Sequence, residues 1–171
     1  MAEERRQLSH LDAAGRARMV DISQKEESVR EAVARGRVSV SPVTLALLKE
    51  AALPKGDVLT VAQVAGIMAA KRTAELIPMC HPIPLSGVDV RLWLSDEPPA
   101  VEIEARVRTK AATGVEMEAL SAVSAAALTV YDMCKSAQRD MVIEGIRLIS
   151  KTGGTRGDYV RLGESPPPAE A

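Results

Sequence analysis

Aromatic residues are nearly absent from this sequence of 171 residues, which has no Phe, one Trp and two Tyr. Each buried aromatic side chain would remove roughly 150–250 Å² from water, so the core must be built from smaller side chains. Alanine is abundant instead, with 26 copies. Close helix packing and contacts between subunits can replace the missing buried area, which favours an oligomer.

A large net charge is missing as well. Lys and Arg number 22 against 23 Asp and Glu, so the formal net charge is −1. Proteins that bind nucleic acid through bulk charge are basic, and this chain also has few aromatic platforms for stacking bases. The composition therefore argues against nucleic acid as a partner, and any anion site must be a local cluster of cations.

The sequence has neither a long apolar run nor a cysteine framework. No stretch of about 18 apolar residues could cross a membrane, and the charged N-terminus lacks the apolar core of a secretory signal. Cys80 and Cys134 are 54 positions apart, which matches no zinc-ligand spacing. We expect a cytoplasmic protein with no membrane contact, no metal site and reduced thiols.

The remaining composition, 46% hydrophobic and 26% charged residues, is typical of a single globular domain. The two ends are polar or proline-rich and unpatterned. We therefore expect a flexible N-terminal segment over residues 1–14, one folded domain over 15–160 and a disordered tail over 161–171.

Periodicity and capping signals predict the secondary structure. Strands are predicted at 88–94 and 101–107, where apolar and polar residues alternate, and also at the short segments 18–22 and 141–149. Helices are predicted after capping residues, at 41–52, 57–76 and 114–137. Residues 29–40 are ambiguous, although their second half alternates. The mixture, with a hairpin about residues 96–99, predicts an α+β sandwich with helices on one face of a mostly antiparallel sheet.

His81 is one of only two histidines, and prolines at 78, 82 and 84 stiffen the segment around it. The histidine is either functional or incidental to a rigid connection between a helix and a strand. A metal pair with Cys80 is disfavoured, because neighbours on an extended chain point to opposite sides.

The long predicted helix carries ionisable residues at both of its ends. Glu116 and Glu118 suit the positive N-terminal end of the helix dipole, which is a sufficient structural explanation. Asp132 and Lys135 are three residues apart, so they can form a surface ion pair. The functional alternative is a carboxylate that orients a lysine for proton transfer.

A glycine-rich, cationic segment runs from Lys151 to Asp158 after the last predicted strand. Its backbone N–H groups and cations could hold phosphate, although it lacks the spacing of a phosphate-binding loop of the P-loop type. Lys55 is a further cation just before a predicted helix start. These residues indicate a small-molecule enzyme that acts on an anion, with lysines and carboxylates as catalysts.

Four stretches of the chain together resemble one family. They are LSHLDAAGRARMVDIS, KGDVLTVAQVAGIMAAKRTAELIPMCHPIPLSGVDV, TGVEMEALSAVSAAALTVYDMCKSAQRDM and ISKTGGTRGDY, and they cover most of residues 8–159. They resemble the MoaC family, the cyclic pyranopterin monophosphate synthases of molybdenum cofactor biosynthesis. The resemblance implies a lyase that converts 3′,8-cyclo-7,8-dihydro-GTP into cyclic pyranopterin monophosphate and releases pyrophosphate.

The resemblance also implies a ferredoxin-like fold, a homohexamer built as a trimer of dimers, and no required cofactor, with a role for Mg²⁺ left open. It implies that Asp132, Lys135 and Lys55 are catalytic. The residues that it implies to bind substrate are Met79, Cys80, His81, Glu116, Met117, Glu118 and Lys151. One departure is Thr155-Arg156, where the family pattern is expected to carry lysine nearer Gly154, so the phosphate contacts of that segment are not carried over.

The spacing along the long helix predicts a site shared between subunits. The resemblance implies that Glu118 and Asp132 belong to one substrate pocket, yet they are fourteen residues apart, which is about 21 Å at 1.5 Å per residue. A substrate of this size does not span that length, and the helix has no internal Pro or Gly to kink it.

A rival function is a catalytically silent module that binds a nucleotide, which would need the cations but neither Asp132 nor His81.

Overall fold

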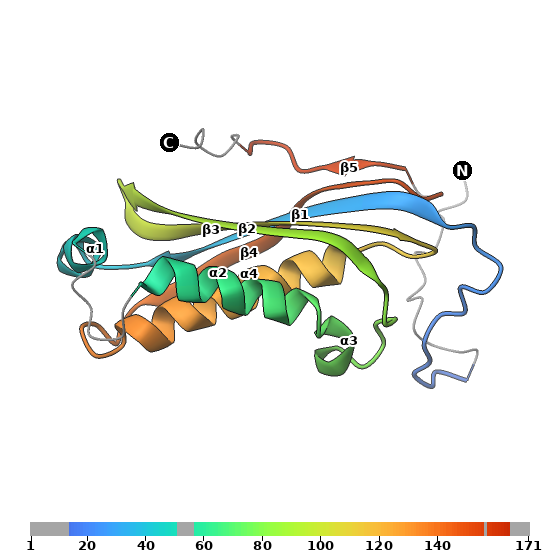
Figure 1. Ribbon diagram of the computed structural model, residues 1–171, viewed down its shortest axis with the longest axis horizontal. Helices are drawn as coiled ribbons and strands as arrows, with labels where there is room; N and C mark the ends of the chain where they lie inside the picture. The colour runs from blue at the N-terminus through green and yellow to red at the C-terminus, as the bar shows by residue number, and fades with distance from the viewer. Residues whose placement is uncertain (1–13, 51–56, 156, 165–171) are drawn as a thin grey trace.

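The computed structural model describes residues 14–50, 57–155 and 157–164, and Figure 1 shows the arrangement of its elements. Within these residues the elements follow in the order β1 (Ser28–Ser39), α1 (Pro42–Lys49), α2 (Val58–Ala70), α3 (Thr73–Leu76), β2 (Leu85–Asp96), β3 (Pro99–Ala111), α4 (Glu116–Cys134), β4 (Val142–Thr152) and β5 (Tyr159–Val160). No helix in the described ranges is long and apolar enough to span a membrane.

The strands form one sheet in the order β2-β3-β1-β4-β5, and every neighbouring pair is antiparallel. Helices α2 and α4 lie side by side on one face of this sheet, while β5 lies on the side away from these helices (Figure 1). This is the predicted α+β, ferredoxin-like arrangement.

The core lies between the sheet and α4, and it consists of small side chains. Ala119, Ala122 and Ala126 of α4 are fully buried, and Ala34 and Val38 of β1 face them from the sheet. The predicted absence of a bulky aromatic core is confirmed. The alanines allow the helix and the sheet to approach closely, which preserves dispersion contacts despite the small side chains.

Gly36 of β1 lies in close contact with α4 and with the neighbouring strand β4. A Cβ atom at this position would lie 2.8 Å from the Val123 side chain of α4 and 2.9 Å from that of Ile146. Real Cβ contacts are not that short, so only glycine fits here. Gly36, which disfavours a helix over residues 29–40, is therefore also a packing requirement of β1.

The predicted helix starts at Ser41 and Asp57 are confirmed. The Ser41 Oγ accepts a hydrogen bond from the Thr44 N–H at 3.1 Å, and Asp57 accepts one from the Thr60 N–H at 3.1 Å. The predicted helix over 57–76 is interrupted, however, because α2 ends at Ala70. The Thr73 hydroxyl bonds to the carbonyls of residues 69 and 70, and such side-chain bonds compete with helical continuation.

The prediction of a strand over residues 18–22 is wrong. This segment pairs with no strand. Its backbone bonds locally and to a side chain instead: the Ile22 carbonyl accepts from the Lys25 N–H at 3.0 Å, and the Val20 carbonyl lies 2.7 Å from His81 Nε2. The ambiguous stretch 29–40 is a strand, β1, paired on both sides. Strand β5 was not predicted.

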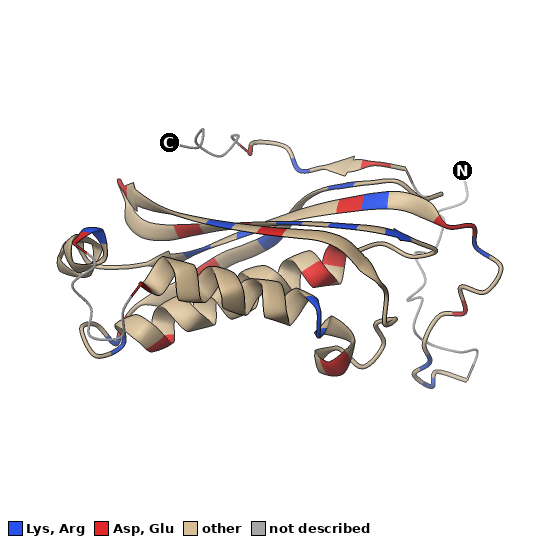
Figure 2. Cartoon of the chain, in the orientation of Figure 1, with Lys and Arg blue, Asp and Glu red and all other residues tan. Residues whose placement is uncertain are grey.

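Charged side chains follow the strands and connections, whereas α2 has none and α4 has them only at its ends (Figure 2). On the sheet, Arg35 pairs with the buried Glu104 at 2.7 Å. Glu164 pairs with Arg147 at 2.6 Å and with Arg35 at 3.4 Å. Residues 161–164, which were predicted to belong to a tail, thus bond to the sheet.

Candidate active site

A cavity of about 280 Å³ lies where the N-terminal end of α4 meets the ends of β1 and β4. It is formed by four further segments: residues 20–25, the connection 79–83, the turn 112–114 and the glycine-rich turn after β4. All of the residues predicted to bind substrate line it, namely Met79, Cys80, His81, Glu116, Met117, Glu118 and Lys151. The structure brings them together, and their role in binding stays a prediction.

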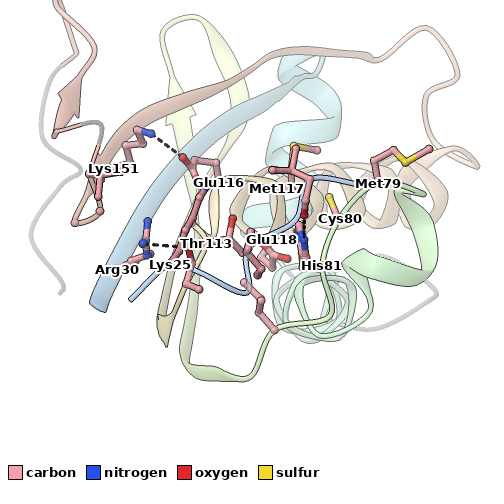
Figure 3. A pocket seen from close by; sticks show the side chains of 18 residues that line it. Lys25, Arg30, Met79, Cys80, His81, Thr113, Glu116, Met117, Glu118 and Lys151 are labelled. Atoms are coloured by element: carbon pink, nitrogen blue, oxygen red, sulfur yellow. Dashed lines mark hydrogen bonds and ion pairs between the residues drawn. The ribbon is translucent and has the colours of Figure 1, made fainter. Parts of the chain in front are cut away.

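The first turn of α4 enters the cavity because β3 ends at Ala111 and only a short turn separates the two elements. Glu116, Met117 and Glu118 therefore project from the helix start beside the connection that carries His81. Figure 3 shows Arg30 and Lys151 toward one side of the cavity and Met79, Cys80 and His81 toward the other. Cations and the predicted substrate-binding residues thus line one cavity.

Glu118 is the most unusual carboxylate in the cavity, because only 4% of its surface is exposed. Burial raises the pKa of Glu118, and the nearby charge of Glu116 raises it further. A carboxyl with a raised pKa retains its proton closer to neutral pH, so it can act as a proton donor. Glu116 differs from it, since Glu116 pairs with Lys151 at 3.0 Å and is partly exposed.

Arg30 and Lys25 also line the cavity, and the sequence analysis missed both. The Arg30 Nε donates to the Ala111 carbonyl at 2.9 Å, and its Nη2 donates to the Ala112 carbonyl at 3.2 Å. Assigning residues 29–40 to a strand would have indicated Arg30, because the β1–β3 pairing carries it to the end of β3. Lys25 lies in an irregular segment and has no sequence signal.

The His81 imidazole connects two segments that are far apart in the sequence. Its Nε2 lies 2.7 Å from the Val20 carbonyl oxygen. A carbonyl oxygen only accepts, so Nε2 carries the proton and donates it. The hydrogen bond holds the segment that carries Lys25 against the cavity and leaves Nδ1 as the remaining polar atom of the ring.

Cys80 lines the cavity as a thiol that is hard to ionise. Burial raises the pKa of Cys80, and the charge of Glu118 adds to this effect. Nucleophilic cysteines need a lowered pKa and a cationic neighbourhood, which is the opposite of these surroundings. Cys80 is therefore suited to packing against a bound ring rather than to attacking it.

The predicted catalytic pair is at the other end of α4, outside this cavity. Lys135 Nζ lies 2.5 Å from Asp132 Oδ1, and both side chains are more than half exposed. The helix runs without interruption between this pair and Glu118. Lys55, the third residue predicted to be catalytic, lies outside the described residues. One chain therefore brings together the substrate-binding set but not Asp132 and Lys135.

The fold and the cavity define an α+β protein whose site combines cations with a buried carboxyl. The model of the MoaC family matches residues 19–154. Proteins named cyclic pyranopterin monophosphate synthase are similar along nearly their whole length. The one from Chloroflexus aurantiacus is 60% identical over 161 residues, which cover 94% of this chain and 99% of that protein.

Two further relatives carry the same name. The protein from Chloroflexus aggregans is 62% identical over 155 residues, covering 91% of this chain and 94% of the relative. The protein from Thermomicrobium roseum is 59% identical over 155 residues, covering 91% and 93%. The chain described here belongs to the MoaC family.

Proposed function

We propose that this chain is a cyclic pyranopterin monophosphate synthase, a lyase of molybdenum cofactor biosynthesis. It converts 3′,8-cyclo-7,8-dihydro-GTP into cyclic pyranopterin monophosphate and releases pyrophosphate. The observation that carries the proposal is the single cavity that gathers Lys25, Arg30 and Lys151 around Glu118 and His81, in a chain whose relatives carry that name.

The substrate's triphosphate accounts for the three cations. Lysine and arginine bind phosphate through charge-assisted hydrogen bonds, and arginine does so with two parallel bonds. Lys151 is paired with Glu116, so a phosphate that binds Lys151 replaces one anionic partner with another. The exchange keeps a charged partner beside Lys151 in both states and favours a highly charged ligand over a neutral one.

The ring rearrangement requires protons to move on and off nitrogen and oxygen atoms. Glu118 supplies a buried carboxyl with a raised pKa inside the cavity. Lys135 and Lys55 provide the acid–base groups, and Asp132 orients Lys135 or relays its proton. No organic cofactor takes part in these steps.

The active site is shared between subunits, with Asp132 and Lys135 of one chain completing the cavity of another. The helix length supports this arrangement, since about 21 Å separate Glu118 from Asp132 along α4. Self-association is supported by a stripe on α2, where Val61, Val64 and Met68 are each close to half exposed. These residues follow helical spacing and suit a homohexamer built as a trimer of dimers.

The decisive experiment incubates the purified protein with 3′,8-cyclo-7,8-dihydro-GTP and follows pyrophosphate release and the pterin product. Turnover is expected in buffer that contains a chelator, and addition of Mg²⁺ then measures any assistance by the metal ion. Binding of the substrate without product would contradict the proposal and would favour a silent nucleotide-binding module.

A further inference from the structure

The glycine-rich turn after β4 contacts the cavity through Gly154. This residue has φ of +85°, and a Cβ atom built on it would lie 2.2 Å from Arg30 Nη1 and 3.0 Å from Arg30 Cζ. The bare Cα of Gly154 is therefore packed against the guanidinium group. Any side chain at this position would occupy the space that the guanidinium fills.

Arg30 is also held from its other side. Its Nε and Nη2 donate to the carbonyls of Ala111 and Ala112 at the end of β3. A planar guanidinium that makes two such bonds has a fixed plane and a fixed direction for its remaining N–H groups. The end of β3 and the Cα of Gly154 thus enclose the group, and both Arg30 and Gly154 line the cavity.

The turn itself is anchored and cannot retreat. The Gly153 N–H donates to Asp158 Oδ1 at 3.1 Å, and Lys151 pairs with Tyr159 in the β4–β5 ladder. A Cβ atom on Gly153 would lie 2.3 Å from the backbone oxygen of Val29, so the backbone of the turn rests on β1. A side chain added at Gly154 must then displace the Arg30 side chain.

We propose that Gly154 is a positioning residue of the phosphate-binding site, which orients Arg30 toward the triphosphate of the substrate. The proposal rests on the proposed function, because it takes the anion to be a nucleoside triphosphate. This proposal gives the glycine-rich turn a specific role. The turn restricts the position of the Arg30 side chain, in addition to any bonds that the backbone of the turn makes to the ligand. The Thr155-Arg156 departure from the family pattern does not affect this role.

The chain offers a matched control in the same turn. Gly157 has φ of +74°, and a Cβ atom built on it meets nothing within 4 Å; Gly157 does not line the cavity. Alanine at Gly154 or at Gly157 imposes the same kind of left-handed backbone strain. Only Gly154→Ala adds a collision with Arg30, so a difference between the two variants reports that collision.

The experiment measures the binding of GTP and GMP by calorimetry at low salt, for the wild-type protein and for both alanine variants. The wild type is expected to bind GTP more tightly than GMP. Gly154→Ala is expected to weaken GTP binding roughly tenfold relative to Gly157→Ala, which is the loss of a charge-assisted bond. GMP binding should change equally in both variants.

A double substitution distinguishes an effect on the orientation of Arg30 from a general loss of stability. In an Arg30→Ala background, Gly154→Ala should weaken GTP binding no further than Gly157→Ala does, because the colliding group is gone. If Gly154→Ala instead lowers the melting temperature well below that of Gly157→Ala, then Arg30→Ala must restore it. Failure of that restoration would overturn the proposal.

The remaining outcomes are also decisive. Equal GTP affinity of Gly154→Ala and Gly157→Ala, with GTP still preferred over GMP, would overturn the role of Gly154 and leave phosphate recognition by the cavity intact. Equal affinity of the wild type for GTP and GMP would remove phosphate recognition itself, and the positioning role with it.

Discussion

The two ends of α4 place carboxylates in opposite surroundings. At the N-terminal end, Glu118 is buried and has a raised pKa. At the C-terminal end, Asp132 is more than half exposed and pairs with Lys135. The comparison shows that one helix supplies two chemically different carboxyl groups, one with a pKa raised by burial and one paired with a cation. Four experiments test this difference.

Loss of the exposed pair should have the largest effect on catalysis. Lys135→Ala or Asp132→Asn is expected to lower turnover by about 10²–10⁴-fold, the range typical of general acid–base groups. Stability should change little, because both side chains are exposed. Single-turnover kinetics would measure the effect on the catalytic rate, and thermal unfolding followed by circular dichroism would measure the effect on stability.

A matched control exists in another exposed ion pair, that of Lys49 with Asp96, which does not line the cavity. Lys49→Ala should leave turnover unchanged. Near wild-type activity of either variant at the end of α4 would show that the exposed pair takes no part in catalysis.

Subunit mixing tests whether the two ends belong to one site. Glu118→Ala and Asp132→Ala proteins, each inactive, are combined under conditions that exchange subunits. A mixed pair of subunits has one site with both defects and one intact site, so random exchange should restore about one quarter of wild-type activity. No recovery despite demonstrated exchange would place each site within one chain.

Glu118→Gln tests the buried end. Because the folded-state pKa of Glu118 is raised, its favourable contribution is complete below the unfolded-state pKa, near 4.3, and is lost as pH rises through the folded-state pKa. Glutamine carries no charge at any pH, so this variant should be more stable at pH 7 by about 0.5–2 kcal/mol and less active. Chemical denaturation at several pH values measures this difference in the free energy of unfolding. A variant less stable than wild type at pH 7 would argue against a buried charge.

Glu164 provides the contrasting carboxylate and the smallest effect. The hydrogen bond from Arg147, with the charges of Arg147 and Arg35, lowers the pKa of Glu164. Its contribution is present above the unfolded-state pKa and is lost as pH falls through the folded-state pKa. Glu164→Gln should cost about 0.5–1 kcal/mol at pH 7 and nothing well below about pH 4, with turnover unchanged. A pH-independent cost would show that packing, not charge, holds this segment.

Local signals predicted the elements that local interactions determine. Ser41 and Asp57 bear hydroxyl and carboxylate groups at helix starts, the hairpin follows from alternation around residues 96–99, and α4 was expected within a few residues of its observed bounds. The motifs that contain His81 and Glu118 were close enough to the family pattern to indicate the cavity residues from sequence.

Long-range contacts account for what sequence analysis missed. Arg30 reaches the cavity only through the pairing of β1 with β3, which is more than 60 residues away in the chain. Strand β5 has two residues, too few for a periodic signal. Residues 18–22 were predicted as a strand from their short run of apolar residues, but they pair with no strand of the sheet, and the Val20 carbonyl instead lies against His81 Nε2.

Ala119, Ala122 and Ala126 form an alanine seam between α4 and the sheet. This seam makes the fold sensitive to larger side chains rather than to smaller ones. Truncation of a buried side chain usually destabilises by leaving a cavity, yet Ala119, Ala122 and Ala126 have almost nothing to remove. Enlargement has no such protection: each added methylene must push the helix from the sheet, at a typical cost of about 1–3 kcal/mol. Accepted substitutions along this seam should therefore be limited to glycine, alanine and serine, and larger residues should appear only in compensating pairs.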